Sequence, residues 1–326
     1  MIIVLFFSTP YFNCKQIILK EESIFIKINS EFNSKQTVTE ELHIKHFYTD
    51  ENAPPVMMIH GAIENGKIFY SSSGKGLAPY LAQNGYDVFV VDLRGRGLSK
   101  PSINKNSKHG LTEILRDDFP AYIKKIKEIK GDVPQHWIAH SWGGVMMLAY
   151  LAKNFESVKI ASMVFFGTKR RITIMSFKKI WRINIMWNIF GRLLIASRGY
   201  LPAKEAKIGS DNETKKSNRE TNVWAKSRKW LDWNDKFDYA AALKKIKLPP
   251  TLYLCGENDD ILGHPKDVKL LMTETGEQDN YFQILGKSTG NKNDYGHNDI
   301  LTHQDAAIDV YPIALNFMKN HHEILV

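Results

Sequence analysis

A series of short apolar segments most strongly constrains the fold of this chain. They are separated by helix-forming stretches, and most lack alternation with polar residues. A strand that is apolar on both faces must be covered on both sides, as in a parallel sheet with helices packed on each face. We therefore expect an α/β fold with a mostly parallel central sheet. The candidate strands read SIFIKI, TEELHIKHFY, PVMMIHG, YDVFVVDLRG, QHWIAHS, VKIASMVFFG, PTLYLCGEND and NYFQILG.

The strand pattern stops within residues 169–247. This segment holds 20 Lys and Arg against 7 Asp and Glu, a net charge of +13, so the rest of the chain carries −4 of the total of +9. It also holds five of the tryptophans, namely Trp181, Trp187, Trp224, Trp230 and Trp233. We interpret residues 169–247 as an inserted, basic helical cap, and residues 1–168 and 248–326 as the core.

Neither the N-terminus nor the cysteines indicate an export signal or a disulfide framework. The apolar run at residues 1–7 is too short to cross a bilayer and has no Lys or Arg ahead of it. Cys14 and Cys255 are two cysteines in a chain of 326 residues, and no Cys/His spacing suggests zinc. We expect a cytoplasmic or peripheral membrane protein. The oligomeric state stays open.

The segment HWIAHSWGGVMMLAYLA changes from a strand pattern to a helix pattern at Ser141. In an open parallel sheet, ligands bind beyond the carboxyl ends of the strands, so a serine at this turn is a candidate nucleophile. A strained turn of this kind requires small neighbours two positions away on either side. Gly143 meets this requirement, and Ala139 replaces the usual first glycine.

A serine hydroxyl becomes an effective nucleophile only when a base removes its proton and a carboxylate orients that base. Asp259 follows the strand PTLYLCG at a G-x-x-D spacing, and His297 follows the strand NYFQILG by a loop. We predict Ser141, Asp259 and His297 as the catalytic residues. The alternatives for the acid are Asp260 and Glu257, the alternative for the base is His303, and we expect a structural role for His140.

Two backbone N–H groups are candidates for stabilising an oxyanion. A tetrahedral intermediate needs preorganised donors, which the start of a helix provides. We predict the N–H groups of Trp142, directly after the serine, and of Ala62, directly after His60 and Gly61. We also expect His60 and Gly61 at the strand end, and Trp187 in the cap, to contact substrate.

With these residues in place, the chain resembles the α/β-hydrolase family, and within it the acid lipases that cleave triglycerides and cholesteryl esters. The resemblance covers most of residues 60–318 except the cap. It implies the α/β-hydrolase fold, and it also places the nucleophile, acid and base on Ser141, Asp259 and His297. The matching pieces are MIHGAIENG, LAQNGYDVFVVDLRGRGLS, RDDFPAYIKKI, IAHSWGG, GENDDILGHPKDVKLL and YGHNDILTHQDAAIDVYPIALNFM.

Two positions depart from the acid lipase pattern. Trp142 stands where that group has Gln, and Asp92 where it has Asn, which makes the chain more similar to bacterial esterases and lysophospholipases. We expect a serine hydrolase that cleaves fatty acyl esters through an acyl-enzyme. An amidase or peptidase, an acyltransferase and a non-catalytic binding protein of the same fold are the alternatives. No metal or organic cofactor is implied, because the triad and oxyanion hole suffice.

The cap bears on the class of substrate. Within SFKKIWRINIMWNIFGRLL, four apolar residues repeat at helical spacing, which predicts an amphipathic helix. Such a helix could act as a lid or contact an anionic membrane surface, or it could simply pack on the core. No nucleic-acid-binding module is present, so we expect an acyl ester or lipid as the partner. The four residues are Ile183, Trp187, Phe190 and Leu194.

Overall fold

The computed structural model describes residues 18–31, 37–174 and 190–322. Ten strands fall within these residues: β1 Lys20–Glu31, β2 Thr37–Tyr48, β3 Pro55–Ile59, β4 Asp87–Asp92, β5 Gln135–His140, β6 Ile160–Phe166, β7 Tyr200–Leu201, β8 Glu213–Thr214, β9 Thr251–Gly256 and β10 Asn280–Leu285. The longer helices are α1 Leu77–Gln83, α3 Phe119–Lys130, α4 Trp142–Asn154, α6 Gly191–Arg198, α7 Lys215–Lys226, α9 Pro265–Glu274 and α12 Tyr311–Asn320. The shorter helices and turns are η1 Gly66–Ile68, α2 Leu111–Glu113, η2 Ile114–Asp118, η3 Phe155–Ser157, α8 Tyr239–Leu243, η5 Lys287–Thr289, α10 Asp299–Thr302 and α11 Ala306–Asp309.

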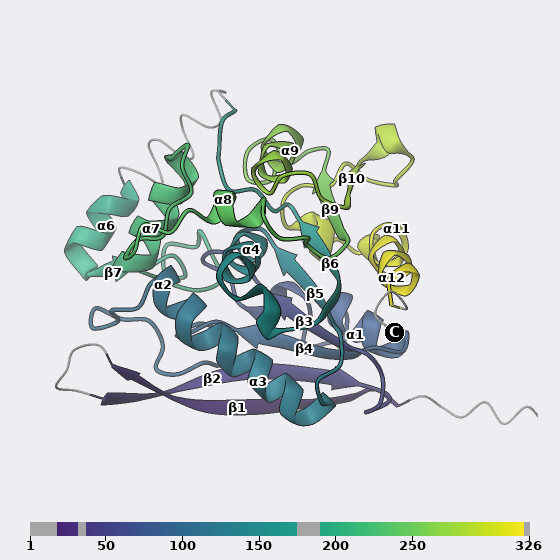
Figure 1. Cartoon of the computed structure of the whole chain (residues 1–326), viewed down its shortest axis with the longest axis horizontal. Helices are drawn as coiled ribbons and strands as arrows, with labels where there is room; N and C mark the ends of the chain where they lie inside the picture. Colours follow the sequence, from purple (N-terminus) through teal and green to yellow (C-terminus); the bar gives the residue numbers. More distant parts are fainter. Residues whose placement is uncertain (1–17, 32–36, 175–189, 323–326) are drawn as a thin grey trace, which may run out of the picture.

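Eight of the strands form one sheet in the order β1-β2-β4-β3-β5-β6-β9-β10 (Figure 1). The strands from β4 to β10 are paired in parallel, while β2 is antiparallel to both of its neighbours. The prediction of a mostly parallel sheet is therefore confirmed. Each predicted strand is present, and the antiparallel β1–β2 ribbon adds to the sheet at one edge.

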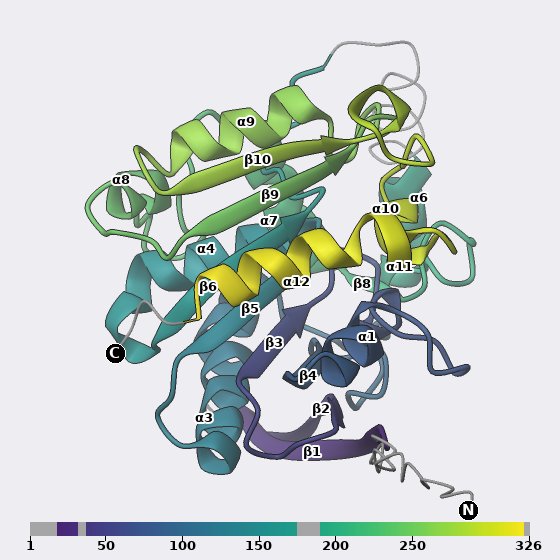
Figure 2. The same ribbon diagram turned by 90° about the vertical axis from the view of Figure 1, so that its right-hand side faces the viewer.

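Helices cover both faces of this sheet, which explains the continuous apolar strands. Successive residues of one strand face opposite cores: Met57 and Ile59 pack with α3 and α4, whereas Val56 and Met58 pack with α1 and α12. Figure 2 shows α12 and α1 in front of the sheet and α3 and α4 behind it. Both layers exclude water from the strands, so no polar alternation is required.

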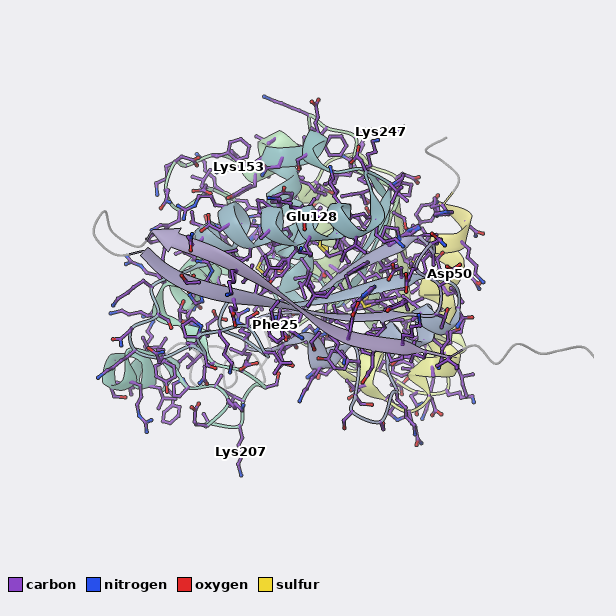
Figure 3. All side chains as sticks on the ribbon, turned by 90° about the horizontal axis from the view of Figure 1, so that it is seen from below. Phe25, Asp50, Glu128, Lys153, Lys207 and Lys247 are labelled. Carbon is purple, nitrogen blue, oxygen red and sulfur yellow. The ribbon has the colours of Figure 1, made fainter. Side chains whose placement is uncertain are left out.

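The β1–β2 ribbon is the partly exposed edge of the sheet (Figure 3). Ile24, Ile26 and Ile28 of β1 pack against the core, whereas Phe25 between them is 50% exposed. This alternation is typical of a strand with one solvated face. It distinguishes β1 from the central strands, whose residues are buried on both faces.

Short helices and the small β7–β8 pair occupy the described part of the predicted cap. Trp224 and Trp230 are buried there, with ring centroids 5.8 Å apart, and both join the core cluster formed with α3 and α4. Trp233 is half-buried, with the Arg219 guanidinium 4.7 Å from its ring centroid. This part of the segment is thus packed onto the sheet's helical layer. Trp181 and Trp187 lie outside the described residues.

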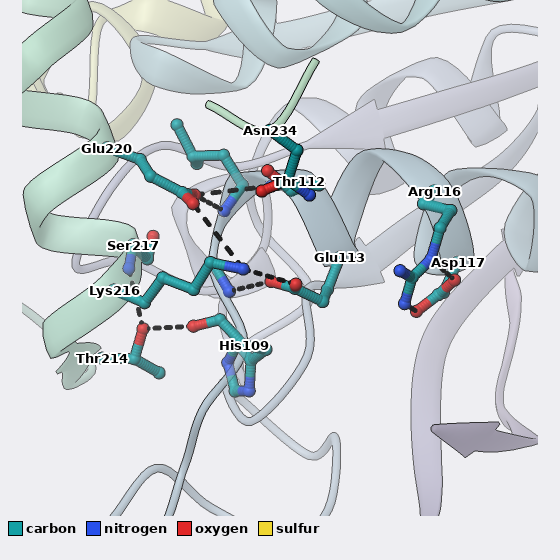
Figure 4. A network of polar contacts seen from close by, with 12 residues as sticks. His109, Thr112, Glu113, Arg116, Asp117, Thr214, Lys216, Ser217, Glu220 and Asn234 are labelled. Carbon is teal, nitrogen blue, oxygen red and sulfur yellow. Dashed lines mark hydrogen bonds and ion pairs between the residues drawn. The ribbon is translucent and has the colours of Figure 1, made fainter. Parts of the chain in front are cut away.

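Polar contacts tie α7 to the loop ahead of α2 (Figure 4). The Glu220 carboxylate accepts a hydrogen bond from the Leu111 N–H at 2.5 Å. The Lys216 ammonium donates to Glu113 at 2.5 Å, and the Thr214 hydroxyl donates to the His109 carbonyl at 2.6 Å. These contacts fix α7 against α2 and the loop ahead of it. In the part of the chain that the structure describes, no helix has the length and apolarity needed to span a membrane.

Candidate active site

Ser141 occupies a strained turn between β5 and α4. Its backbone has φ 50° and ψ −119°, a conformation that is rare for a residue with a side chain. Its N–H donates to the Phe166 carbonyl at 2.7 Å, which anchors the turn to β6. A Cβ on Gly143 would lie 2.5 Å from the Ile59 carbonyl oxygen, so glycine is required there. Ala139 is fully buried, so its methyl group is accommodated in the core.

The three predicted catalytic residues come together at the carboxyl edge of the sheet. The Ser141 Oγ lies 2.8 Å from the His297 Nε2, and the His297 Nδ1 lies 2.6 Å from the Asp259 Oδ2. Ser141 follows β5, Asp259 follows β9, and His297 is in the loop after β10. Because parallel strands end at the same edge, residues distant in sequence form one continuous hydrogen-bond chain.

Burial and hydrogen bonding shift the pKa values of Asp259 and His297 in opposite directions. Burial alone would raise the pKa of Asp259, but the hydrogen bond and the charge of His297 bring it below its usual value. For His297, burial lowers the pKa, and the bond to Asp259 opposes that effect. The arrangement therefore keeps the carboxylate ionised and leaves the imidazole available as a base near neutral pH.

The alternative residues do not reach this hydrogen-bond chain. Asp260 and Glu257 are exposed, whereas Asp259 is buried. The His303 Nδ1 accepts from the Asp305 N–H at 3.2 Å at the end of α10. Among the candidates that the sequence left open, only Asp259 faces the ring of His297.

Two glycines that the sequence analysis did not single out make room for the acid–base pair. Gly167 follows β6 with φ 59°, and a Cβ there would lie 3.0 Å from the His297 ring. A Cβ on Gly263 would lie 2.4 Å from the Asp259 Oδ2. The turns after β6 and β9 can therefore approach the two side chains only as bare backbone.

The predicted oxyanion donors lie beside the serine. A Cβ on Gly61 would come within 2.9 Å of the Ser141 Cβ, so the turn that carries Ala62 lies against Ser141. Trp142 is the first residue of α4, and the first N–H groups of a helix have no acceptor within that helix. Both N–H groups therefore belong to backbone segments that border the Ser141 side chain.

His60 is not placed to contact substrate, which corrects the sequence-based expectation. Its side chain is fully buried. Its Nδ1–H donates to the Gly61 carbonyl at 2.9 Å, and its Nε2 accepts from the Leu93 N–H at 3.1 Å. Both ring nitrogens are thus used to fix the turn after β3. His60 shapes this turn, and Gly61 is the residue that approaches Ser141.

A pair formed by the partly buried Glu64 and the fully buried His140 supports the site. The Glu64 carboxylate accepts from the Gly61 N–H at 2.9 Å and from the His140 Nδ1–H at 2.8 Å. The His140 Nε2–H donates to the His297 backbone carbonyl at 3.0 Å. Both ring nitrogens face acceptor oxygens, and Glu64 raises the pKa of His140 although burial would lower it, which favours the protonated ring. The pair connects the turn beside Ser141 to the loop that carries His297, a role that the glutamate in GAIENG could have signalled.

Asp92, the first residue of the DLRGRG segment, holds the surrounding loops in place through its hydrogen bonds. The Asp92 carboxylate accepts from the N–H groups of Gly66 at 2.7 Å and Leu98 at 2.9 Å, and it bonds the His43 ring at 2.7 Å. His43 belongs to β2, Gly66 begins η1, and Leu98 lies in the loop after β4. Asp92 therefore organises the loop and does not extend the hydrogen-bond chain of Ser141.

The predicted apolar face of the cap is described only in part. Ile183 and Trp187 lie outside the described residues. Phe190 is 48% exposed, and Leu194 is partly buried against a small cluster with Ile195 and Leu201. Leu193, which the helical spacing did not include, is 63% exposed. The start of α6 thus presents apolar surface to solvent, and the prediction for Trp187 stays a prediction.

Residues 54–188 match the family model of the alpha/beta hydrolase fold. The "Probable lysophospholipase L2" of Haemophilus influenzae is 28% identical over 128 residues, which is 39% of this chain and 40% of that protein. The "Monoglyceride lipase" of Saccharomyces cerevisiae is 29% identical over 120 residues, 36% of each chain. The chain thus matches about two fifths of the length of these relatives.

Solved structures resemble the chain over most of its length. A thermophilic esterase from Thermogutta terrifontis aligns with a TM-score of 0.55 and 16% identity, covering 92% of this chain and 99% of the esterase. At this level of identity the likeness concerns the fold. The sheet order, the family match over residues 54–188 and the solved structures together show that the chain has the α/β-hydrolase fold, and its sequence is similar to proteins named as ester hydrolases.

Proposed function

We propose that this protein is a serine hydrolase that cleaves carboxylic esters with a fatty acyl part through an acyl-enzyme intermediate. The observation that supports this function is the hydrogen-bond chain from the Ser141 Oγ through His297 to Asp259, with distances of 2.8 and 2.6 Å. The first distance allows a proton to pass from the Ser141 Oγ to the His297 Nε2, and the second lets Asp259 orient the imidazole ring.

The first half of the reaction forms the acyl-enzyme. The His297 Nε2 takes the hydroxyl proton as the Ser141 Oγ attacks the ester carbonyl carbon, and Asp259 stabilises the resulting imidazolium through its Nδ1–H. The N–H groups of Ala62 and Trp142 stabilise the oxyanion. The tetrahedral intermediate then collapses, the bond to the alcohol oxygen breaks, and His297 gives its proton to the departing alcohol.

The second half releases the acid. Water enters, His297 takes one of its protons, and the hydroxide oxygen attacks the acyl carbonyl carbon. Collapse of the second tetrahedral intermediate breaks the bond to the Ser141 Oγ, which recovers its proton from His297. The same base serves both halves, so a His297 pKa below the usual value favours activity from neutral pH down into the mildly acidic range.

The names of the relatives support a fatty acyl ester as substrate. One is named a probable lysophospholipase and the other a monoglyceride lipase, and both names describe enzymes that act on lipids. For this chain we propose an ester with a fatty acyl part. Chain length and head group are left to the assay described below.

We also propose that residues 169–247 form a cap that governs access to Ser141 and contacts an anionic membrane surface. The net charge of this segment and the exposed Phe190 and Leu193 at the start of α6 support it. Basic residues near a surface contribute about 1 kcal/mol each to binding anionic lipid at low ionic strength. A cytoplasmic or peripheral membrane localisation is part of this proposal.

Labelling and hydrolysis together test the proposed function. A fluorophosphonate probe should label the wild-type protein and leave Ser141→Ala unlabelled. A series of p-nitrophenyl esters of increasing chain length should be hydrolysed with a preference for longer chains, while a p-nitroanilide of the same acid should react far more slowly. Faster cleavage of the anilide would identify an amidase, and transfer to an added alcohol in preference to water would identify an acyltransferase. No labelling at Ser141 would refute the catalytic proposal.

The cap proposal has its own test. Replacing both Phe190 and Leu193 by Ser should lower the rate on long, aggregated esters relative to short, soluble ones, because only the former require an apolar surface to approach. Binding to anionic vesicles should weaken as the salt concentration rises. An unchanged ratio of rates together with no vesicle binding at low salt would refute a role in access.

A further inference from the structure

Lys169 is a buried cation close to the candidate active site. It follows β6 by three residues, directly after Gly167 and Thr168, and it is 5% exposed. Its Nζ lies 5.9 Å from the centroid of the Trp142 ring, and Trp142 is the residue after Ser141. Lys169 therefore borders the first turn of α4, next to the predicted nucleophile.

Its ammonium group has no acceptor among the described residues. The neighbouring carboxylates are engaged elsewhere: Asp259 bonds His297, and Asp267 accepts from the Thr173 N–H at 2.9 Å. Both lie near enough to oppose the lowering of the Lys169 pKa that burial causes, but neither forms an ion pair with it. Lys169 thus differs from the adjacent Arg170, whose guanidinium bonds Glu274 at 2.6 Å.

Two polar groups near Lys169 are buried without a hydrogen-bond partner in the described structure. They are the Trp142 Nε1–H and the Thr168 hydroxyl. Thr168 packs against the first turn of α4, since a Cβ on Gly144 would lie 2.6 Å from its Oγ1. The neighbourhood therefore offers several unused donors, including one cation, and an oxygen-rich anion complements such a set.

Packing alone does not account for a cation at this position. A lysine over an aromatic ring gains about 0.5 to 2 kcal/mol, and 5.9 Å is near the outer limit of that contact. Removing an ammonium group from water without a counter-charge costs several kcal/mol. Asp259 and Asp267 offset only part of this cost, since the pKa of Lys169 stays below its usual value, so a ligand with negative oxygen atoms would stabilise the charge further.

We propose that Lys169 binds an anionic group, a phosphate or a carboxylate, carried by the ester that reacts at Ser141. This inference rests on the proposed function and adds a substrate class to it: acyl esters with a negative charge near the scissile bond. The phosphate would come from the alcohol part of the ester and the carboxylate from the acyl part.

Matched substrates test the proposal. Monodecanoylglycerol is compared with monodecanoylglycerol phosphate, and p-nitrophenyl hexanoate with the p-nitrophenyl monoester of hexanedioic acid, whose short chain keeps the carboxylate near the scissile bond. In wild type, kcat/KM should favour the anionic member of at least one pair. In Lys169→Met this preference should fall by about tenfold or more, which is the contribution of one charged hydrogen bond. The pair that responds identifies the source of the anion.

The control is Lys247→Met, which removes an exposed lysine ahead of the amino end of β9, at the opposite end of the strand from Asp259. It should keep the wild-type preference. No preference for either anionic ester in wild type, or the same preference in wild type and Lys169→Met, would overturn the proposal. If the neutral esters and the fluorophosphonate also fail to react, the proposed function itself fails.

A binding measurement keeps the proposal testable if Lys169 variants fold poorly. Ser141→Ala retains Lys169 and cannot turn over. Calorimetry should show that this protein binds the preferred anionic ester at least about tenfold more tightly than its neutral partner. Equal affinities would overturn the proposal without any Lys169 variant.

Discussion

The Glu64–His140 pair should give the protein a characteristic dependence of stability on pH. His140 holds the pKa of the Glu64 carboxyl at about 2, against an ordinary value of 4.5, although burial alone would raise it. At about 1.4 kcal/mol per tenfold change in proton affinity, this difference corresponds to about 3 kcal/mol of stability. Glu64→Gln removes the charge and should remove most of that contribution.

The direction of this pH dependence follows from the pKa shifts of Glu64 and His140. The pKa of Glu64 is lowered on folding, so its contribution is complete above pH 4.5 and is lost as the pH falls through about 2. Burial would lower the pKa of His140, but Glu64 raises it above 6.5, so the contribution of His140 is complete below pH 6.5 and is lost as the pH rises through the raised value. Both describe one interaction, which is therefore strongest between about pH 4.5 and 6.5.

Urea unfolding of wild type and Glu64→Gln from about pH 3 to about pH 9 measures this effect. The difference in unfolding free energy should be largest between pH 4.5 and 6.5 and should decrease on either side. The control is Glu51→Gln, since Glu51 is 70% exposed and forms a surface pair at 3.4 Å. Its difference should stay near zero. A difference for Glu64→Gln that does not change with pH would refute the charged pair.

Three further predictions concern the site and the anchoring of α7. Asp259→Asn should lower turnover about 10⁴-fold in the ester assay and Asp260→Asn hardly at all, so equal losses would contradict the assignment of the acid. Gly143→Ala should destabilise the protein by about 1 to 3 kcal/mol in urea unfolding, because its Cβ would collide with the Ile59 carbonyl; an unchanged midpoint would show that the turn can relax. Burial raises the pKa of Glu220 to about 7, so wild type should lose stability as the pH rises from about 4.5 to 7, and Glu220→Gln should not; parallel thermal-unfolding profiles would contradict this.

The central sheet was predictable because the apolar composition of its strands shows that both faces of each strand are buried. A segment such as VKIASMVFFG has no polar face and therefore requires cover on both sides, which fixes the fold class. Placement after successive parallel strands then brings Ser141, Asp259 and His297 to one edge of the sheet. Asp259 could be separated from Asp260 because spacing from the strand end determines which side chain turns inward.

The roles of His60, Glu64 and Lys169 depend on contacts across the fold and could not be predicted. His60 is buried by the approach of the loop after β4, and nothing near it in sequence indicates that its two ring nitrogens are used. Glu64 meets His140 from 76 positions away. Among the residues that the structure describes, the Lys169 ammonium has no hydrogen-bond acceptor, and such an absence has no sequence pattern. These properties arise from distant segments, whereas periodicity reports only local structure.

The separation of Ser141 and His297 along the chain has a consequence for biosynthesis. The two residues are 156 positions apart, and the loop that carries His297 is attached to the end of β9 through the bond from the Asn258 N–H to the Tyr295 carbonyl. At about 5 to 20 residues per second, a ribosome exposes the serine roughly 8 to 30 s before its base. During that interval the nascent chain holds an unactivated hydroxyl. Under the proposed mechanism, ester hydrolysis begins only after β9 and β10 have joined the sheet, because Asp259 and His297 reach Ser141 only then.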